Sequence, residues 1–243
     1  MRSVGELVKE RLGRAKIFER FGIDYFCGGK ESLRLSCVSS GVDLVAVVQE
    51  LQDEEASGTK LAQMDWSKRA IFQLVDHIDE SHNQFLKTEL PRLLTVIDGL
   101  RKSYARSHPE LFEIRDIFRN LTIELGIHVL NDERLLFPLC RAVGRAGAAP
   151  LKRTDPKNLV SVIQAGNEST AEAMKKIRDL TNHYAFPNDV GNSYKFMLQA
   201  LRGLEADLHL HIHEENNVLF PLLLTEDFSP ASNDSPPDQN SWM

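Results

Sequence analysis

The feature that most constrains this chain is a pair of similar segments, which begin at His128 and at His211. In each segment an acid follows the histidine by four residues, Asp132 in the first and Glu215 in the second. Each segment then continues through an apolar stretch to Phe-Pro. Four residues are about one turn of an α-helix, so each histidine shares a face with its acid. Two such faces turned toward each other would bring two imidazoles and two carboxylates to one point, as in metal sites of four-helix bundles.

The rest of the chain favours the same architecture. Helical periodicity recurs throughout, and few segments alternate with the period of a strand. We therefore expect an all-α protein, with a small N-terminal helical domain over residues 1–53 and an antiparallel four-helix bundle over residues 66–224. Polar residues 54–65 are predicted to form a linker, and the Ser-, Pro- and Asp-rich tail, 225–243, to be disordered. The bundle helices are expected at about 66–103, 109–143, 156–181 and 189–224.

Composition excludes some partners. The net charge of −6 argues against nucleic acid as a main partner, because phosphate binding needs a basic face. No apolar run is long enough to span a bilayer, and the N-terminus lacks the apolar core of a signal peptide. The three cysteines, Cys27, Cys37 and Cys140, form no disulfide framework, so a reducing cytoplasm is the expected compartment and no membrane partner is expected. A homodimer stays open.

Both histidine–acid pairs continue apolar helix stripes, so we expect all four side chains to point into the bundle. A buried carboxylate without a partner costs several kcal/mol, and two of them beside two imidazoles suggest a shared cation such as iron, manganese or zinc. A single such pair would more often be an ordinary side-chain contact. His209 and His213 lie off the stripe and are expected to face solvent, whereas Glu124, one turn before His128, is expected to support that ligand from behind.

Two motifs carry a resemblance to a known family. They are Glu215-Asn-Asn-Val-Leu-Phe-Pro221, with His211 four residues before its acid, and Gly22-Ile-Asp-Tyr-Phe-Cys27-Gly-Gly-Lys30. Together they resemble the hemerythrin-like di-iron proteins and, more narrowly, the RIC (ScdA/YtfE) proteins that repair iron–sulfur clusters. The resemblance implies a non-haem di-iron centre bridged by two carboxylates in a hemerythrin-like bundle. It also implies repair of clusters damaged by nitric oxide or oxidants, with iron–sulfur proteins as clients.

The resemblance implies a ligand set in which His128 and His211 are terminal ligands, while Asp132 and Glu215 bridge the irons. Asp132 is shorter than the Glu of the family, so bridging would need a shift of the helix or the metals. The family also takes one histidine from the first bundle helix and one from the third. Alignment places Asn83 and Asn167 at these positions.

An amide offers a metal only its neutral carbonyl oxygen, so iron occupancy is doubtful. The two asparagines could equally be core amides bonded to neighbouring acids. On the first helix, periodicity favours His82 as a ligand while alignment favours Asn83, and both stay open. Glu168, next to Asn167, lies off its helix stripe.

Cys27 is the second functional candidate. The resemblance implies that Cys27 contacts the damaged cluster or its protein, although the family often has two adjacent cysteines and Phe26 stands here instead. We expect an exposed Cys27 thiol, with Lys30 close enough to favour the thiolate, and a buried, inert Cys140. The alternative is a small apolar side chain packed beneath the turn.

Three functions follow. The first is a cytoplasmic non-haem di-iron stress protein that repairs iron–sulfur clusters, and whether this is enzymatic stays undecided. The second is a ligand-depleted hemerythrin-like bundle that acts as a binding or regulatory module without tight iron. The third is reversible oxygen or nitric oxide binding, for which the five-histidine ligation is absent.

Overall fold

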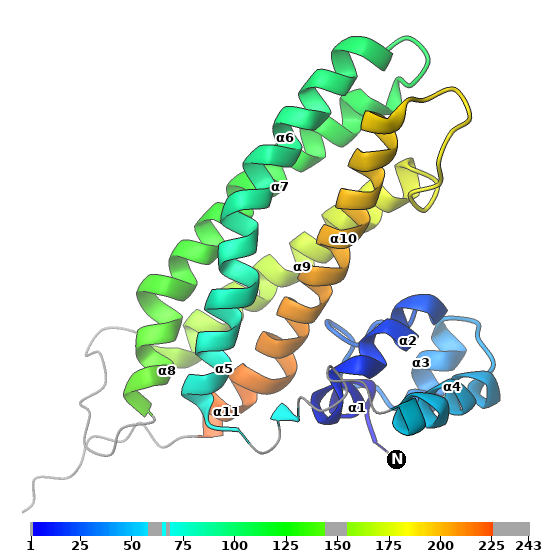
Figure 1. Ribbon diagram of the computed structural model, residues 1–243. Helices are drawn as coiled ribbons and strands as arrows, with labels where there is room; N and C mark the ends of the chain where they lie inside the picture. Colours follow the sequence, from blue (N-terminus) through cyan, green and yellow to red (C-terminus); the bar gives the residue numbers. More distant parts are fainter. Residues whose placement is uncertain (1, 58–64, 67–68, 144–154, 226–243) are drawn as a thin grey trace, which may run out of the picture.

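The computed structural model describes residues 2–57, 65–66, 69–143 and 155–225, and these ranges are almost wholly helical (Figure 1). The only strand-like pairing in them is an isolated bridge between Ser3 and Ser32. The all-α prediction is confirmed. The N-terminal module consists of five short helical elements: α1 (Val4–Glu10), η1 (Leu12–Arg14), α2 (Ala15–Phe21), α3 (Leu33–Ser39) and α4 (Leu44–Ser57). Residues 54–57 of the predicted linker continue α4, whereas 58–64 and, apart from Thr225, the predicted tail lie outside the described residues.

Local signals explain where the helices of this module begin and end. Ser3 and Glu6 form a reciprocal cap at the start of α1, in which each side chain accepts a hydrogen bond from the backbone N–H of the other. Gly22 ends α2 with a φ of 64°, in the left-handed region that glycine tolerates best. The module is therefore a set of capped, short helices rather than a long bundle.

Four long helices form the bundle, and three of them contain a π turn. The described elements, in chain order, are α5 (Ile71–His77), η4 (Ile78–Asn83) and α6 (Gln84–Tyr104); α7 (Glu110–Asn131), η5 (Asp132–Leu136) and α8 (Phe137–Val143); α9 (Pro156–Leu180); and α10 (Asn192–Glu214), η6 (Glu215–Leu219) and α11 (Phe220–Thr225). The first helix begins at Ile71, later than the expected 66, because Ala70 is still extended, with a ψ of 147°. The third bundle helix, α9, begins at Pro156 as expected, and the Asp155 side chain caps it.

The bundle helices run alternately up and down (Figure 1). The helix α6 packs against α7 and α10, and α9 packs against the same two helices, so each helix contacts two neighbours around a common interior. The N-terminal module lies against the end of the bundle where α5 begins and α11 ends (Figure 1). No described helix combines the length and the apolar character that crossing a bilayer would require.

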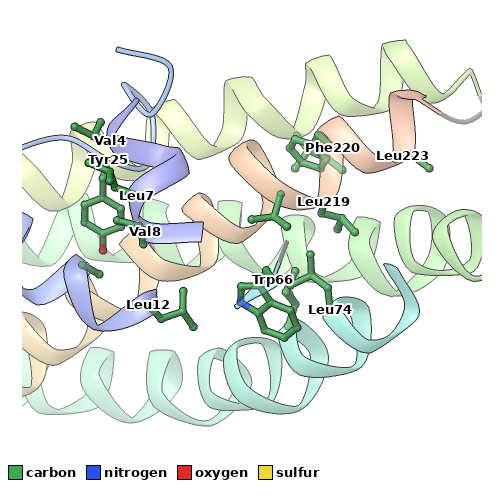
Figure 2. Close-up of a cluster of buried hydrophobic side chains, with 14 of the residues drawn as sticks. Val4, Leu7, Val8, Leu12, Tyr25, Trp66, Leu74, Leu219, Phe220 and Leu223 are labelled. Atoms are coloured by element: carbon green, nitrogen blue, oxygen red, sulfur yellow. The ribbon is translucent and has the colours of Figure 1, made fainter. Parts of the chain in front are cut away.

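Two hydrophobic cores fill the molecule. The first, the domain-contact core, joins the N-terminal module to the near end of the bundle, and Figure 2 shows Val4 and Tyr25 of the module on the same cluster as Trp66 and Phe220. The second, the distal core, fills the far part of the bundle with residues such as Phe118. A polar layer separates the two along the helices. Its members are Asn83, His128, Asp132, Asn167, His211 and Glu215.

Backbone contacts dock the N-terminal module on the last bundle helix. The Asn217 side-chain amide donates to the carbonyl oxygens of Tyr25 and Phe26 at 3.2 and 3.0 Å. A Cβ at Gly29 would lie only 2.3 Å from the Asn217 side chain, so any larger residue would displace the amide that holds Tyr25 and Phe26. Part of the Cys-Gly-Gly motif is thereby explained, because its second glycine lets the two domains approach closely.

Candidate metal centre

Two helices supply the four main residues of the candidate site. On α7 and η5 these are His128 and Asp132, and on α10 and η6 they are His211 and Glu215. In both cases the α-helix is regular from the histidine to the residue before the acid, so the histidine and the acid lie on one face. The π turn starts at the acid. Single π turns inside α-helices are rare and occur frequently at functional sites.

The four side chains converge on one point. The Nε2 atoms of His128 and His211 lie 3.4 Å apart. His128 Nε2 is 3.3 Å from Asp132 Oδ2, and His211 Nε2 is 3.4 Å from Glu215 Oε1. Two donors that bind one ion at about 2.1 Å lie no more than about 4.2 Å apart. These separations therefore suit ligands of a shared cation.

The two asparagines lie in the same layer, one on each acid. The Asn83 amide donates to Asp132 Oδ2 at 3.3 Å, and the Asn167 amide donates to Glu215 Oε2 at 2.8 Å. Both asparagines are buried, and Asn83 Oδ1 accepts no hydrogen bond from the residues that the structure describes. Each amide therefore orients one carboxylate, and the free oxygen of Asn83 is available as a weak ligand.

Burial and proximity set the charges of the site. Burial, followed by the charge of Glu215, raises the pKa of Asp132. Burial opposes ionisation of Glu215 too, but His128, His211 and the Asn167 hydrogen bond outweigh it and lower its pKa to about 2. Burial lowers the pKa of His128 to about 4. The two acids are therefore shifted in opposite directions, and at neutral pH His128 is a neutral imidazole whose lone pair can bind metal.

The donor set fits a transition-metal ion. Asp132 Oδ1 and Glu215 Oε1 are buried, and among the described residues the nearest donor to Glu215 Oε1 is His211 Nε2 at 3.4 Å, a long contact. Buried polar atoms normally have partners, and a cation would supply the missing interaction to both oxygens. Carboxylates with imidazoles suit iron, manganese or zinc. His128, Asp132, His211 and Glu215 would hold the ion.

His82 and Asn83 face different groups. Whereas Asn83 contacts Asp132, His82 Nδ1 lies 2.9 Å from Asp207 Oδ1 and its Nε2 lies 3.4 Å from Glu214 Oε2. His77 and Glu214, which the sequence did not single out, complete a second cluster with His82. His77 and His82 are five residues apart, and in a regular α-helix they would point to different faces. Because η4 is a π turn, the two side chains lie on the same face. Periodicity calculated for an α-helix cannot detect this cluster.

The expectation for His209 and His213 is wrong. Both are buried, at 3% and 0% exposure, because the N-terminal module covers that face of α10. The His209 ring stacks on Phe26 with centroids 3.8 Å apart, and His213 Nδ1 lies 3.3 Å from the carbonyl oxygen of Tyr25. The apolar stripe of α10 predicts only the face that packs inside the bundle. It cannot predict that the N-terminal module buries the face with His209 and His213.

Glu124 and Glu168 lie outside the polar layer. The expectation that Glu124 supports His128 is also wrong, since Glu124 is exposed and accepts a hydrogen bond from Ser169 at 3.2 Å. Glu168 is exposed as well and does not replace Asn167, in agreement with its position off the stripe.

Cys27 lies in a cavity between the domains rather than on an open surface. The cavity measures about 860 Å³, and Asp24 and Glu168 also line it. Burial, followed by the charges of Asp24 and Glu168, raises the pKa of the Cys27 thiol to about 12. The expectation of a reactive thiolate is therefore wrong, because burial and the two carboxylates favour the neutral thiol. Cys140 is fully buried, as expected.

Curated relatives match almost the whole chain. A Haemophilus influenzae protein named a probable iron–sulfur cluster repair protein is 25% identical over 223 residues, which are 92% of this chain and 96% of the relative. The iron–sulfur cluster repair protein YtfE of an Enterobacter species and that of an Escherichia coli strain are each 26% identical over 226 residues. These matches cover 91% of this chain and 96% of each relative.

Family models divide the chain in two. Residues 1–55 match the ScdA_N model, described as a domain of unknown function. Residues 73–223, well over half of the chain, match the hemerythrin HHE cation-binding domain. The order of the two domains and the full-length relatives agree with the resemblance drawn from the motifs around Cys27 and Glu215. The chain belongs to the hemerythrin-like family and, within it, to the RIC (ScdA/YtfE) proteins.

Proposed function

We propose that this protein is a cytoplasmic non-haem iron protein that repairs iron–sulfur clusters damaged by nitric oxide or oxidants. One observation carries the proposal: the buried His211, Asp132 and Glu215 converge with the partly buried His128 in the polar layer, with their potential ligand atoms close to one point. The names of the curated relatives supply the repair function. Clients would be iron–sulfur proteins.

The residues of the polar layer would have distinct tasks. His128, His211, Asp132 and Glu215 would hold the iron, two through imidazole nitrogens and two through carboxylate oxygens. When bound, the iron would supply a redox-active, exchangeable cation for cluster chemistry. Asn83 and Asn167 hold the two acids in place through their amides and would bind iron only weakly, so we expect weaker retention than at a site with two more imidazoles.

Cys27 would act on the client side. Its thiol faces a cavity large enough for a segment of a partner, but the raised pKa keeps it protonated at neutral pH. A neutral thiol is a poor nucleophile. We therefore propose that Cys27 binds rather than attacks, and that it loses its proton only when a metal centre of the client reaches it.

Iron loading without oxygen tests the metal part of the proposal. Protein purified anaerobically and incubated with Fe²⁺ should retain iron after desalting, and the variant Asp132→Asn with Glu215→Gln should lose it. Asp116→Asn is a suitable control, because this acid is exposed on α7. Elemental analysis measures both. Equal iron in the parent and in the double variant would overturn the proposed ligands.

A repair assay tests the function itself. An enzyme whose [4Fe–4S] cluster has been damaged with nitric oxide should regain activity faster with the iron-loaded protein than with free Fe²⁺ at equal concentration. The Asp132→Asn with Glu215→Gln variant should give no acceleration. If Cys27→Ser repairs as well as the parent, the thiol has no part in the reaction.

One observation favours a second candidate. Because the Asn83 and Asn167 amides already donate to the two acids, the bundle can fold without iron. A ligand-depleted module that binds or regulates a partner would use this metal-free form. Absence of bound metal after anaerobic loading, together with a normal fold, would favour this candidate.

A further inference from the structure

A second cluster of potential ligands lies beside the polar layer and has no role in the function proposed above. It consists of His77 at the end of α5, His82 in η4 and Glu214 at the end of α10. His77 Nε2 lies 3.3 Å from Glu214 Oε1, and His82 Nε2 lies 3.4 Å from Glu214 Oε2. Both imidazoles thus direct the same nitrogen at the two oxygens of one carboxylate.

The Nδ1 atom of each imidazole contacts an oxygen of another side chain. His82 Nδ1 lies 2.9 Å from Asp207 Oδ1, and His77 Nδ1 lies 3.2 Å from Ser81 Oγ. Histidines that bind metals almost always use one nitrogen for the metal and donate with the other to a carboxylate, carbonyl or water, which fixes the tautomer. The contact between His82 and Asp207 has this carboxylate–histidine arrangement, with Nε2 left for an ion.

The carboxylate is also held in place. Trp66 Nε1 donates to Glu214 Oε1 at 3.0 Å, and Trp66 is almost fully buried. Glu214 is 1% exposed, and its Oε2 has no hydrogen-bond partner in the part of the chain that the structure describes. Each oxygen of this buried carboxylate faces one imidazole nitrogen, Oε1 at 3.3 Å from His77 and Oε2 at 3.4 Å from His82, so the potential ligand atoms surround one point that fits a cation.

Access differs between the two clusters. The His77 side chain is 24% exposed, whereas the side chains of His82 and Glu214 are almost completely covered. Three protein ligands leave at least one position open in a tetrahedral site, and open sites bind water or an exchangeable ligand. An ion here would therefore meet solvent on the His77 side.

We propose that His77, His82 and Glu214 form a separate binding site for a divalent transition-metal ion. Two imidazoles and a carboxylate suit Zn²⁺ or Fe²⁺. The site is independent of the ligands His128 and His211, although the His82 and His211 rings lie close, with centroids 5.4 Å apart. The competing arrangement is an ion-paired network of the same side chains without metal, and the experiment must separate the two.

Cobalt binding in a chain without the first site tests the proposal. Full-length protein carrying Asp132→Asn and Glu215→Gln is titrated with Co²⁺ under anaerobic conditions, and visible absorption is followed. The chain has two tryptophans, so Trp242→Phe leaves Trp66 as the only fluorophore of this kind. We expect one Co²⁺ per chain, with quenching of Trp66 fluorescence in step with the absorption and release of Co²⁺ on addition of Zn²⁺.

Variants assign the binding to this cluster. Adding His77→Ala should weaken Co²⁺ binding by at least about 100-fold, more than the roughly 10- to 100-fold expected for Asp207→Asn, which removes only the partner behind His82. His108→Ala is the matched control, because His108 is also a buried histidine that contacts two acids. It should leave binding unchanged.

The outcomes are decisive even if the double-variant background folds poorly. In the otherwise unaltered chain, His77→Ala should lower the Co²⁺ stoichiometry by one, and circular dichroism should show an unchanged fold. No Co²⁺ binding in the background, or binding that is insensitive to His77→Ala, would overturn the proposal. Co²⁺ at this cluster without iron in the polar layer would reject the proposed function alone.

Discussion

The polar layer and the distal core lie in the same four helices but differ in the side chains that they bury and in their helix geometry. In the distal core, residues such as Phe118, Leu201 and Met197 are fully buried apolar side chains on regular α-helices. In the polar layer, Asp132 and Glu215 are equally buried, and the helices that carry them change to π turns at these acids. The bundle thus combines a region built for stability with a region whose buried acids need an external partner.

This difference predicts how free energy is distributed. Removing an apolar side chain from the distal core should cost stability directly, because the lost contacts are part of folding. Changing the acids of the polar layer should have little effect on the metal-free protein, because burial penalises the charge of Asp132 whereas His128, His211 and Asn167 stabilise the charge of Glu215. Metal affinity should respond in the opposite way: it should fall when the acids are changed and stay the same when an apolar side chain of the distal core is removed.

The largest effect is expected in the distal core. Phe118→Ala should lower the free energy of unfolding by about 3–5 kcal/mol, since the ring is completely buried. Phe112→Ala, on the same helix, is the control, because Phe112 is 49% exposed and mainly meets Arg101. Urea denaturation measures both. Folded Phe118→Ala should bind iron as the parent does, and a parallel loss of iron affinity would show that the two regions are coupled.

Restoring ligands should give the next largest effect. Asn83→His with Asn167→His should raise iron affinity by at least about tenfold, about 1.4 kcal/mol, because each change adds an imidazole to the layer. Competition with a chelator measures this affinity. Asn120→His, at an exposed position of α7, should change nothing. If the double variant binds no better, Asn83 and Asn167 do not face the ion.

Neutralising the acids should have a smaller effect on folding. Asp132→Asn with Glu215→Gln should leave the metal-free protein as stable as the parent, or more stable by up to about 1 kcal/mol. The parent should gain stability from iron by mass action, and the variant should not. Melting curves with and without Fe²⁺ report both quantities. A large loss of metal-free stability would mean that the acids are structural partners of Asn83 and Asn167.

The smallest effect concerns Glu205, a buried acid beside the distal core. Glu205 contacts Arg178 at 3.1 Å, whereas the acids of the polar layer face each other. Burial raises its pKa, although His209 and Arg178 act in the opposite direction. From about pH 4.5 to the raised pKa the folded state therefore binds more protons than the unfolded state, so stability falls as pH rises through this window.

Glu205→Gln should remove this fall. At pH 7 the variant should gain about 0.5 kcal/mol or less, and below pH 4 it should match the parent. Denaturation at several pH values measures the difference. A destabilised variant at pH 7 would mean that the ion pair with Arg178 outweighs burial, so that the carboxylate contributes to stability.

Much of the polar layer follows from local rules. A histidine four residues before an acid on an apolar stripe lies on the buried face of any regular helix, so His128 with Asp132 and His211 with Glu215 needed only the helical period. The all-α fold and the family were predicted in the same way, from periodicity and from the motifs at Cys27 and Glu215. The assignment of iron to the layer stays a prediction.

For the ligand from the first bundle helix, alignment favoured Asn83 and periodicity favoured His82. Both side chains are buried, but Asn83 contacts Asp132 whereas His82 contacts Asp207. The reason is the π turn of η4, which changes the angle between successive residues and cannot be read from an α-helical pattern. The cluster of His77, His82 and Glu214 depends on the same turn. Its three members come from two helices whose ends meet only in the folded bundle.

The sequence by itself determined which residues of each regular helix face inward, because helical geometry is local and repeats every few residues. Tertiary structure alone decided what covers the other faces. The N-terminal module buries His209 and His213, and the cavity that it forms with the bundle places Asp24 and Glu168 near Cys27 and raises its pKa. Apart from Asp24, which is local to Cys27, the contacting residues lie more than 100 positions away in the sequence, so only the folded chain could determine these environments.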